Sequence, residues 1–202
     1  ESLVGLLHDD DLSIVLKALA GMRKSPALSA MPRLVELTEH PNPDVRCQSL
    51  EVLAEIKDEA SIRILEERLL NDCSVDVRAA AARGLGRTGD AKVISLLERS
   101  LGDESAVRCA AALALGAFGD DSVVPALLAS LKDPVPEVRY HALSGLGKLK
   151  ATYAVRPIQG MLEDPDETVR LGALKTLEHL GIRISGHSFA QRFASQASRL
   201  MP

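Results

Sequence analysis

The chain has 202 residues, a net charge of −4 at pH 7 and 46% hydrophobic residues, yet only 2% aromatic residues. A core with so few aromatics must consist of Leu, Val, Ile and Ala, which suits closely packed helices. A net negative charge provides no general attraction to nucleic acid or acidic membranes. No apolar run approaches the ~20 residues that span a bilayer, and no signal-peptide pattern opens the chain. We therefore expect neither a membrane nor a nucleic acid as the partner.

The cysteines indicate a reducing environment. Cys47, Cys73 and Cys109 have neither the number nor the spacing of a disulfide framework or a metal site. Free thiols are typical of reducing compartments, which predicts a cytoplasmic location. The sequence opens at Glu1 in the middle of an apolar pattern. We therefore expect a piece of a longer parent chain, whose remainder is itself a possible partner.

One motif recurs along the chain at a spacing of about 31 residues. In its clearest copy, DCSVDVRAAAARGLGRTGD from Asp72 to Asp90, a polar turn precedes Val-Arg and an Ala/Gly-rich run. A fixed period of this length is typical of solenoids, in which each unit buries its apolar face against its neighbours. A looser copy around Ile14 brings the expected number of units to six. The valine of the motif recurs at Val45, Val77, Val107, Val138 and Val169, in steps of 32, 30, 31 and 31.

Each unit is predicted to form two helices. In one unit, Ser122 is the expected N-cap of a helix with Val124, Leu127 and Leu131 at helical spacing. Pro125 then falls in the first turn, where its missing N–H costs nothing. The same pattern predicts helices near 3–8, 12–23, 32–39, 44–56, 61–71, 75–87, 91–101, 105–117, 136–148, 154–162 and 167–180.

Glycines divide into two predicted roles. Those inside second helices let neighbouring helices approach closely, at a cost of about 1 kcal/mol each in helix propensity. Gly89, Gly119 and Gly181 follow helical patterns and are expected to end them in left-handed geometry.

The pattern Asp-Pro-x-x-x-Val-Arg-x-x-Ala-x-x-x-Leu-Gly resembles a HEAT repeat of the phycobilisome lyase-like subtype. The resemblance implies an all-α fold, a right-handed αα-superhelix or α-solenoid of about six helix pairs. First helices would line its convex face and second helices its concave face. We expect a solenoid over 1–184 and a C-terminal capping or docking helix over 185–202. The expected repeats lie near 1–25, 26–57, 58–89, 90–119, 120–150 and 151–184.

Most proteins with such repeats are protein-binding scaffolds, and a minority are enzymes, including bilin lyases, deoxyhypusine hydroxylases and DNA glycosylases. No His in this sequence precedes Glu, and Cys-x-x-Cys, His-x-x-x-His and Gly-x-Ser-x-Gly are missing. We therefore expect no catalytic residues, metal or cofactor. The prediction is a non-catalytic scaffold or adaptor that binds a partner protein through its concave face. Two alternatives stay open: a bilin lyase-like subunit acting on a phycobiliprotein, and a regulatory domain of a larger signalling protein.

The arginines of the Val-Arg motifs could form a basic stripe for phosphate. An Asp usually stands five or six residues upstream, at Asp72, Asp103, Asp133 and Asp164. In similar repeats such Arg and Asp residues form an internal ladder, which the resemblance implies here too. The arginines concerned are Arg46, Arg78, Arg108, Arg139 and Arg170.

The second helices supply the candidate partner site. Counting from each motif valine, offsets +2, +3, +6 and +10 face away from the buried side. In the later repeats these offsets give an apolar centre rimmed by cations, which predicts an acidic or amphipathic partner segment. The alternative is that the cations merely solvate this face while Leu113 packs on a neighbour. The candidate residues are Arg83, Arg87, Cys109, Leu113, Tyr140, His141, Ser144, Lys148, Leu171 and Lys175.

Overall fold

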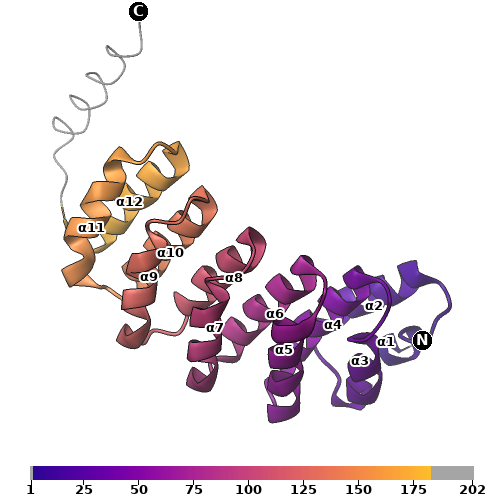
Figure 1. Cartoon of the computed structure of the whole chain (residues 1–202). Coiled ribbons are helices and arrows are strands. Elements are labelled where there is room, and N and C mark those ends of the chain that lie inside the picture. Colours follow the sequence, from indigo (N-terminus) through magenta and orange to yellow (C-terminus); the bar gives the residue numbers. More distant parts are fainter. Residues whose placement is uncertain (1, 183–202) are drawn as a thin grey trace, which may run out of the picture.

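The computed structural model describes residues 2–182, which form helices and turns without any strand. The predicted all-α fold of six helix pairs is confirmed (Figure 1). The expected capping or docking helix at 185–202 lies outside the described residues. The pairs are α1 (Leu3–Leu6) with α2 (Leu12–Met22), α3 (Met31–Leu37) with α4 (Pro43–Ile56), α5 (Glu59–Asn71) with α6 (Val75–Thr88), α7 (Ile94–Ser100) with α8 (Ser105–Leu115), α9 (Val124–Ser130) with α10 (Pro136–Lys148), and α11 (Val155–Gly160) with α12 (Glu167–His179).

Several first helices begin with a short 3-10 turn that the sequence pattern did not predict. Ser122 lies inside one of these turns, Asp121–Val123, and is not the N-cap. The cap is Asp120, whose carboxylate accepts a hydrogen bond from the backbone N–H of Ser122 at 2.8 Å. A charged carboxylate two residues upstream is a stronger acceptor than a hydroxyl, so it sets the start of the element. Pro125 lies in the first turn of α9, as predicted.

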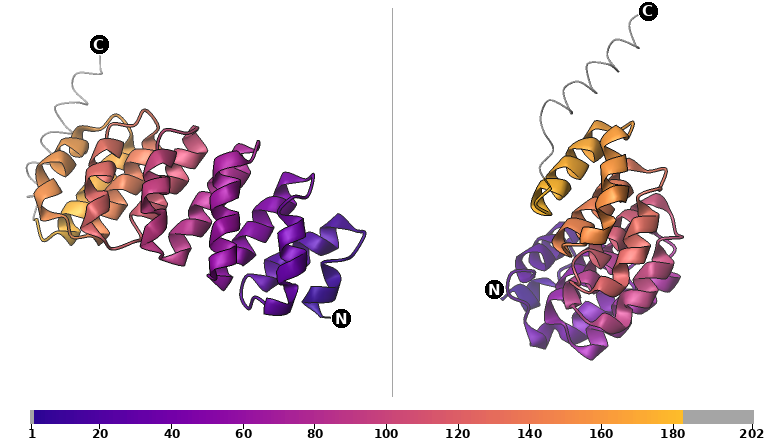
Figure 2. Two further views of the ribbon diagram at one scale, coloured as in Figure 1. Left: turned by 60° about the horizontal axis from the view of Figure 1, so that its bottom comes forward. Right: turned by 90° about the vertical axis from the view of Figure 1, so that its left-hand side faces the viewer.

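The second helices form the inner row of a curved, elongated body. α4, α6, α8, α10 and α12 each pack along the second helix of the preceding pair. First helices pack mainly on their own second helices, and Figure 1 shows the second helices on the inner side of the bend. The views in Figure 2 show the pairs stacked one after another along the body.

Small residues allow this close stacking. A Cβ atom placed on Gly145 of α10 would lie 2.8 Å from the Cα of Gly116, at the end of α8. A Cβ on Gly86 of α6 would lie 2.6 Å from the Cβ of Ala114 in α8. Both distances are shorter than atoms tolerate, so these contacts between backbones require glycine. The predicted left-handed helix ends are also confirmed: Gly89, for example, ends α6 with a φ of 73°.

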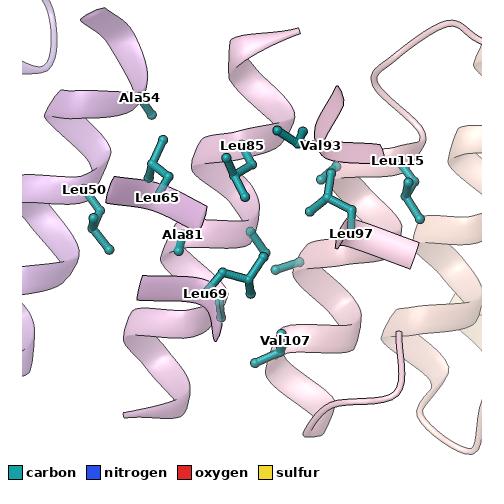
Figure 3. Close-up of a cluster of buried hydrophobic side chains, with 14 of the residues drawn as sticks. Leu50, Ala54, Leu65, Leu69, Ala81, Leu85, Val93, Leu97, Val107 and Leu115 are labelled. Atoms are coloured by element: carbon teal, nitrogen blue, oxygen red, sulfur yellow. The ribbon is translucent and has the colours of Figure 1, made fainter. Parts of the chain in front are cut away.

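The core runs through the body as one continuous cluster of aliphatic side chains. Figure 3 shows Leu65 of α5 between Ala54 of α4 and Leu85 of α6. Each buried Leu contributes roughly 1.5–3 kcal/mol through removal of apolar surface from water. Among the described residues, the largest fully buried side chains are leucines and one methionine, as the composition predicted. Among the described aromatic residues, Phe118 and Tyr140 are partly buried against this core, and Tyr153 is exposed.

Candidate partner-binding surface

The motif arginines form an internal ladder, as predicted. Arg46 donates hydrogen bonds from Nε and Nη2 to the two carboxylate oxygens of Asp72, both at 2.9 Å. Both side chains are almost fully buried. Four of the five motif arginines bind the Asp of the following repeat in this way, across one repeat boundary, whereas Arg170 donates to the backbone carbonyls of Asp164 and Pro165 in its own repeat. The same two-point contact joins Arg78 to Asp103, Arg108 to Asp133 and Arg139 to Asp164.

The ladder also fixes the turns between helices. Arg78 donates from Nη1 to the backbone carbonyl of Asp72 at 3.0 Å, inside its own repeat. The Asp72 carboxylate in turn accepts the backbone N–H of Ser74. Hydrogen bonds from Arg78 lower the pKa of Asp103. Burial alone would raise the pKa of Asp72, but the bonds from Arg46 and Ser74 outweigh it and lower that pKa. These arginines stabilise the fold and offer no free stripe for phosphate.

The inner face is different, because it carries a hollow between α10 and α12. The hollow has a volume of about 270 Å³ and contains four of the predicted residues. His179 also lies at an outward offset, ten residues after Val169. The sequence pattern missed Gly147, Gly172 and Thr176, because two are glycines and Thr176 counts as a buried position. We call it the lysine hollow; its lining residues are Tyr140, Ser144, Gly147, Lys148, Gly172, Lys175, Thr176 and His179.

Glycine and threonine hold the floor of the lysine hollow. A Cβ on Gly172 would lie 2.9 Å from Cδ2 of Tyr140, so the aromatic ring rests directly on the backbone of α12. The Thr176 hydroxyl lies 2.8 Å from the carbonyl oxygen of Gly172 and 3.2 Å from that of Leu143, to which it donates across the helix boundary. The ring of His141 meets Tyr140 edge-on, with centroids 5.7 Å apart and planes at 69°. Tyr140 is therefore held in a fixed position on the surface.

Cations line the far end of this hollow. Lys148, in the last turn of α10, and Lys175 of α12 are both exposed. Neither forms an ion pair with any residue between 2 and 182. Their charges are therefore available to a bound group. His179, in the last turn of α12, lies at the same end.

A second hollow of about 260 Å³ lies on the other side of Tyr140, where α10 and α12 begin. Its lining is acidic, which sequence reasoning did not foresee. Asp166 caps α12 by accepting the backbone N–H groups of Thr168 and Val169, at 2.9 and 3.1 Å. Burial lowers the pKa of His141, which leaves its ring neutral at pH 7. We call this the carboxylate hollow; its lining residues are Pro136, Glu137, Tyr140, His141, Asp166 and Thr168.

The structure places Arg83 and Arg87 apart from these hollows, on α6. Both are half-buried, and the Nε of Arg87 lies 3.1 Å from a carboxylate oxygen of Glu55 on α4. Arg87 thus has an internal partner that the sequence analysis did not assign. The signal was present, because Glu55 and Arg87 both follow their motif valine by ten residues in neighbouring repeats.

The remaining predicted residues lie on α8 and α12. Leu113 is 37% exposed and Leu171 is 46% exposed, so both present apolar surface to solvent. Cys109 is half-buried, and burial raises the pKa of its thiol. Burial likewise raises the pKa of Cys47, at the same offset in α4, to about 11. These thiols are protonated at neutral pH, which makes them poor nucleophiles.

The described residues contain neither a cluster suited to a metal ion nor a helix suited to a membrane. Between residues 2 and 182, His, Cys, Asp and Glu side chains form no group of three that could hold a metal ion. Within the same range, no helix combines the length and the apolar character needed to cross a bilayer.

Several solved structures of helical-repeat proteins are similar to this chain in fold. The crystal structure of YibA from Escherichia coli is 24% identical, with a TM-score of 0.72, covering 87% of this chain and 68% of that one. The complex of CpcE and CpcF of phycocyanin lyase from a Nostoc species is 23% identical, with a TM-score of 0.57, covering 88% and 63%. A designed armadillo repeat protein in complex with the peptide (KR)4 is 18% identical, with a TM-score of 0.57, covering 88% and 98%.

Sequence comparisons identify the family. Among curated proteins, no sequence matches this chain. The family profile described as HEAT repeats matches three times, over residues 1–74, 65–136 and 124–191. Because these matches together span nearly the whole sequence, the chain belongs to the HEAT-repeat family.

Proposed function

We propose that this chain is a non-catalytic scaffold or adaptor that binds a segment of a partner protein on its inner face, across α10 and α12. The observation that carries the proposal is the lysine hollow: an aromatic ring held on a glycine floor, beside two exposed lysines without ion-pair partners in the described chain. The ring supplies apolar contact area and the lysines supply electrostatic attraction. The expected occupant is an acidic or amphipathic segment.

Tyr140 has the properties of a binding anchor. Anchors in protein interfaces are enriched in Tyr, Trp and Arg, and each contributes 2 kcal/mol or more. A ring already fixed by Gly172 and His141 loses little conformational freedom on binding. The exposed Leu171, on the same inner-row helix as Gly172, extends the apolar area. Only 2% of the residues in this chain are aromatic, and Tyr140 of this surface is one of them.

Proteins of similar fold form complexes with a peptide or with another protein. The designed armadillo repeat protein binds the (KR)4 peptide, and CpcE forms a complex with CpcF. A helical solenoid can therefore receive both an extended peptide and a whole protein. The designed protein binds a basic peptide. We propose that the present chain instead binds a segment with acidic residues, because Lys148 and Lys175 attract acidic groups. The segment would belong to a separate partner protein or to another part of a larger signalling protein. We propose that this binding takes place in the cytoplasm.

A second candidate function is a bilin lyase-like subunit acting on a phycobiliprotein. The fold likeness to the phycocyanin lyase subunits favours it. A bilin bound by the protein would change its visible absorbance. Mixing the chain with phycocyanobilin therefore tests this alternative, and an unchanged bilin spectrum contradicts it.

The main proposal is tested with peptides selected from a random display library, using the 202-residue chain as bait. Tyr140→Ala should speed dissociation of the selected peptides by about thirtyfold, the kinetic equivalent of an anchor contributing 2 kcal/mol. Tyr153→Ala is the matched control, since Tyr153 is 62% exposed in the turn before α11, outside the inner row. Surface plasmon resonance measures both rates.

The lysines should act on association instead. Replacing Lys148 and Lys175 by Glu should slow association and flatten its dependence on salt, because exposed charges mainly steer the encounter. Lys92→Glu with Lys132→Glu is the control pair, since both lysines are exposed and lie at first helices. Equal kinetics for the Tyr140 and Tyr153 variants, with unchanged circular dichroism, would overturn the proposal.

A further inference from the structure

The two hollows share one wall, Tyr140, and differ in charge. On one side of the ring the surface carries Lys148 and Lys175, and on the other it carries Glu137 and Asp166. Sequence reasoning found the cations alone, because carboxylates at the start of a helix are ordinarily explained by capping and the helix dipole. The structure brings both sets onto one continuous surface.

The acidic end is open to a bound cation. Glu137 is exposed, and neither it nor Asp166 forms an ion pair within residues 2–182. Arg139 interacts electrostatically with Asp166, but its guanidinium binds the carboxylate of Asp164 at 2.6 and 2.8 Å. Arg170, four residues after Asp166 on α12, donates to the backbone carbonyls of Asp164 and Pro165. His141 faces Glu137 and Lys148 and is neutral at pH 7. The negative charge at this end therefore remains available.

The geometry fixes the spacing of the two ends. Glu137 and Lys148 are eleven residues apart on α10, which at 1.5 Å per residue is about 16 Å. Asp166 and Lys175 are nine residues apart along α12, or about 13 Å. An extended peptide rises about 3.3 Å per residue, so four or five residues bridge the two ends. Tyr140 lies between them.

We propose that the surface recognises a charge-sorted segment of a partner protein. One acidic residue would lie against Lys148 and Lys175, an apolar residue against Tyr140, and a basic residue against Glu137 and Asp166. The two charged residues would be about four or five positions apart if the segment is extended. This inference rests on the proposed function and adds the order and spacing of the partner's charges. A uniformly acidic segment would meet repulsion at Glu137 and Asp166.

Two charge exchanges test the proposal on synthetic, fluorescein-labelled copies of the library-selected peptides, by fluorescence polarisation. Lys148→Glu with Lys175→Glu should weaken binding by about tenfold, since like charges face each other. Changing the acidic residue of the peptide to Lys should restore the affinity. Glu137→Lys with Asp166→Asn should weaken binding similarly, and changing the basic residue of the peptide to Glu should restore it. Asn is chosen because it retains the cap of α12.

The outcomes separate this inference from the proposed function. The inference is supported if two conditions hold. The peptide with its acidic residue changed to Lys must rescue only the Lys148 and Lys175 variant, and the peptide with its basic residue changed to Glu must rescue only the Glu137 and Asp166 variant. Loss at the lysine end alone, with Glu137 and Asp166 variants binding as the parent, overturns it and leaves a simple acidic partner. A peptide of the same composition with its charges interleaved should bind about tenfold more weakly; equal binding also overturns the inference. Peptides insensitive to Tyr140→Ala, or a library that yields no binder, overturn the proposed function as well.

Discussion

At the scale of single residues, the motif arginines show how one side chain can join two repeats. The guanidinium of Arg46 binds Asp72 of the next repeat with two nitrogens, and its third nitrogen donates to the carbonyl of His40 in its own turn. The planar fork matches the carboxylate with two parallel bonds, which a lysine could not provide. Because the pair is buried, removing either side chain should destabilise the fold, since the other charge would be left without its partner.

Arg46→Ala should lower the free energy of unfolding by about 2 to 4 kcal/mol at pH 7. The loss should shrink as pH falls. In the parent the pKa of Asp72 is lowered, so the stability of the pair is present above the unfolded pKa of about 3.9 and is lost as pH falls through the folded pKa. In the variant, burial without Arg46 raises that pKa, and protonation relieves the unpaired charge.

Urea melts at pH 7 and near pH 3.5 measure this difference. Arg156→Ala is the control, since Arg156 is an exposed arginine on α11. Its effect should stay within about 0.5 kcal/mol at both pH values. A loss for Arg46→Ala that is equal at both pH values would assign the effect to packing of the arginine stem, and not to the charge pair.

At the scale of helices, close contact between backbones sets the spacing of the inner row. α8 and α10 meet where Gly116 and Gly145 face each other, and the side chain of Leu127 covers the same point, 2.9 Å from a Cβ on Gly145. Glycine lowers helix propensity by about 1 kcal/mol relative to alanine. The sequence nevertheless keeps glycine at this position, because no side chain fits between the helices.

Gly145→Ala should therefore destabilise the protein by about 1–3 kcal/mol, despite the gain in helix propensity, because the methyl group would overlap the backbone of α8. Gly160→Ala is the matched control, since a Cβ there meets nothing within 4 Å. It should be neutral or slightly stabilising. Thermal melts by circular dichroism compare the two variants, and an equal or higher midpoint for Gly145→Ala would show that the helices can separate without loss.

The helices could be predicted well from the sequence because every repeat carries the same residue pattern. Val77, Val107 and Val138 recur at nearly one period, so a local ambiguity in one copy is resolved by the others. Half of the residues that line the lysine hollow were predicted as site residues, because helical offsets identify the exposed side of each second helix. Helical offsets describe one helix at a time, however. They could not show that Glu137 and Asp166 meet beside Tyr140, nor that Arg87 reaches Glu55.

At the scale of the whole molecule, stability must vary along the body, because each pair contacts only its neighbours. α6 packs against α4, α5 and α8, and seven of its residues are buried. α1 has four residues, none of them buried, and packs chiefly on α2. The first pair therefore has fewer apolar contacts to lose when it opens than the pairs at the centre.

Hydrogen exchange should reveal this gradient in the 202-residue chain. Backbone amides of α2 should exchange at least about tenfold faster than those of α6, since local opening of an end pair costs less than opening of the centre by 1.4 kcal/mol or more. α2 and α6 are comparable in length, with 11 and 14 residues, so mass spectrometry can follow similar peptides from both. Equal protection would mean that all pairs open as one cooperative unit. If all pairs open together, Gly145→Ala should raise the exchange rate equally in α2 and α6. If the pairs open separately, the exchange rate should rise first in α8 and α10, which meet at Gly145.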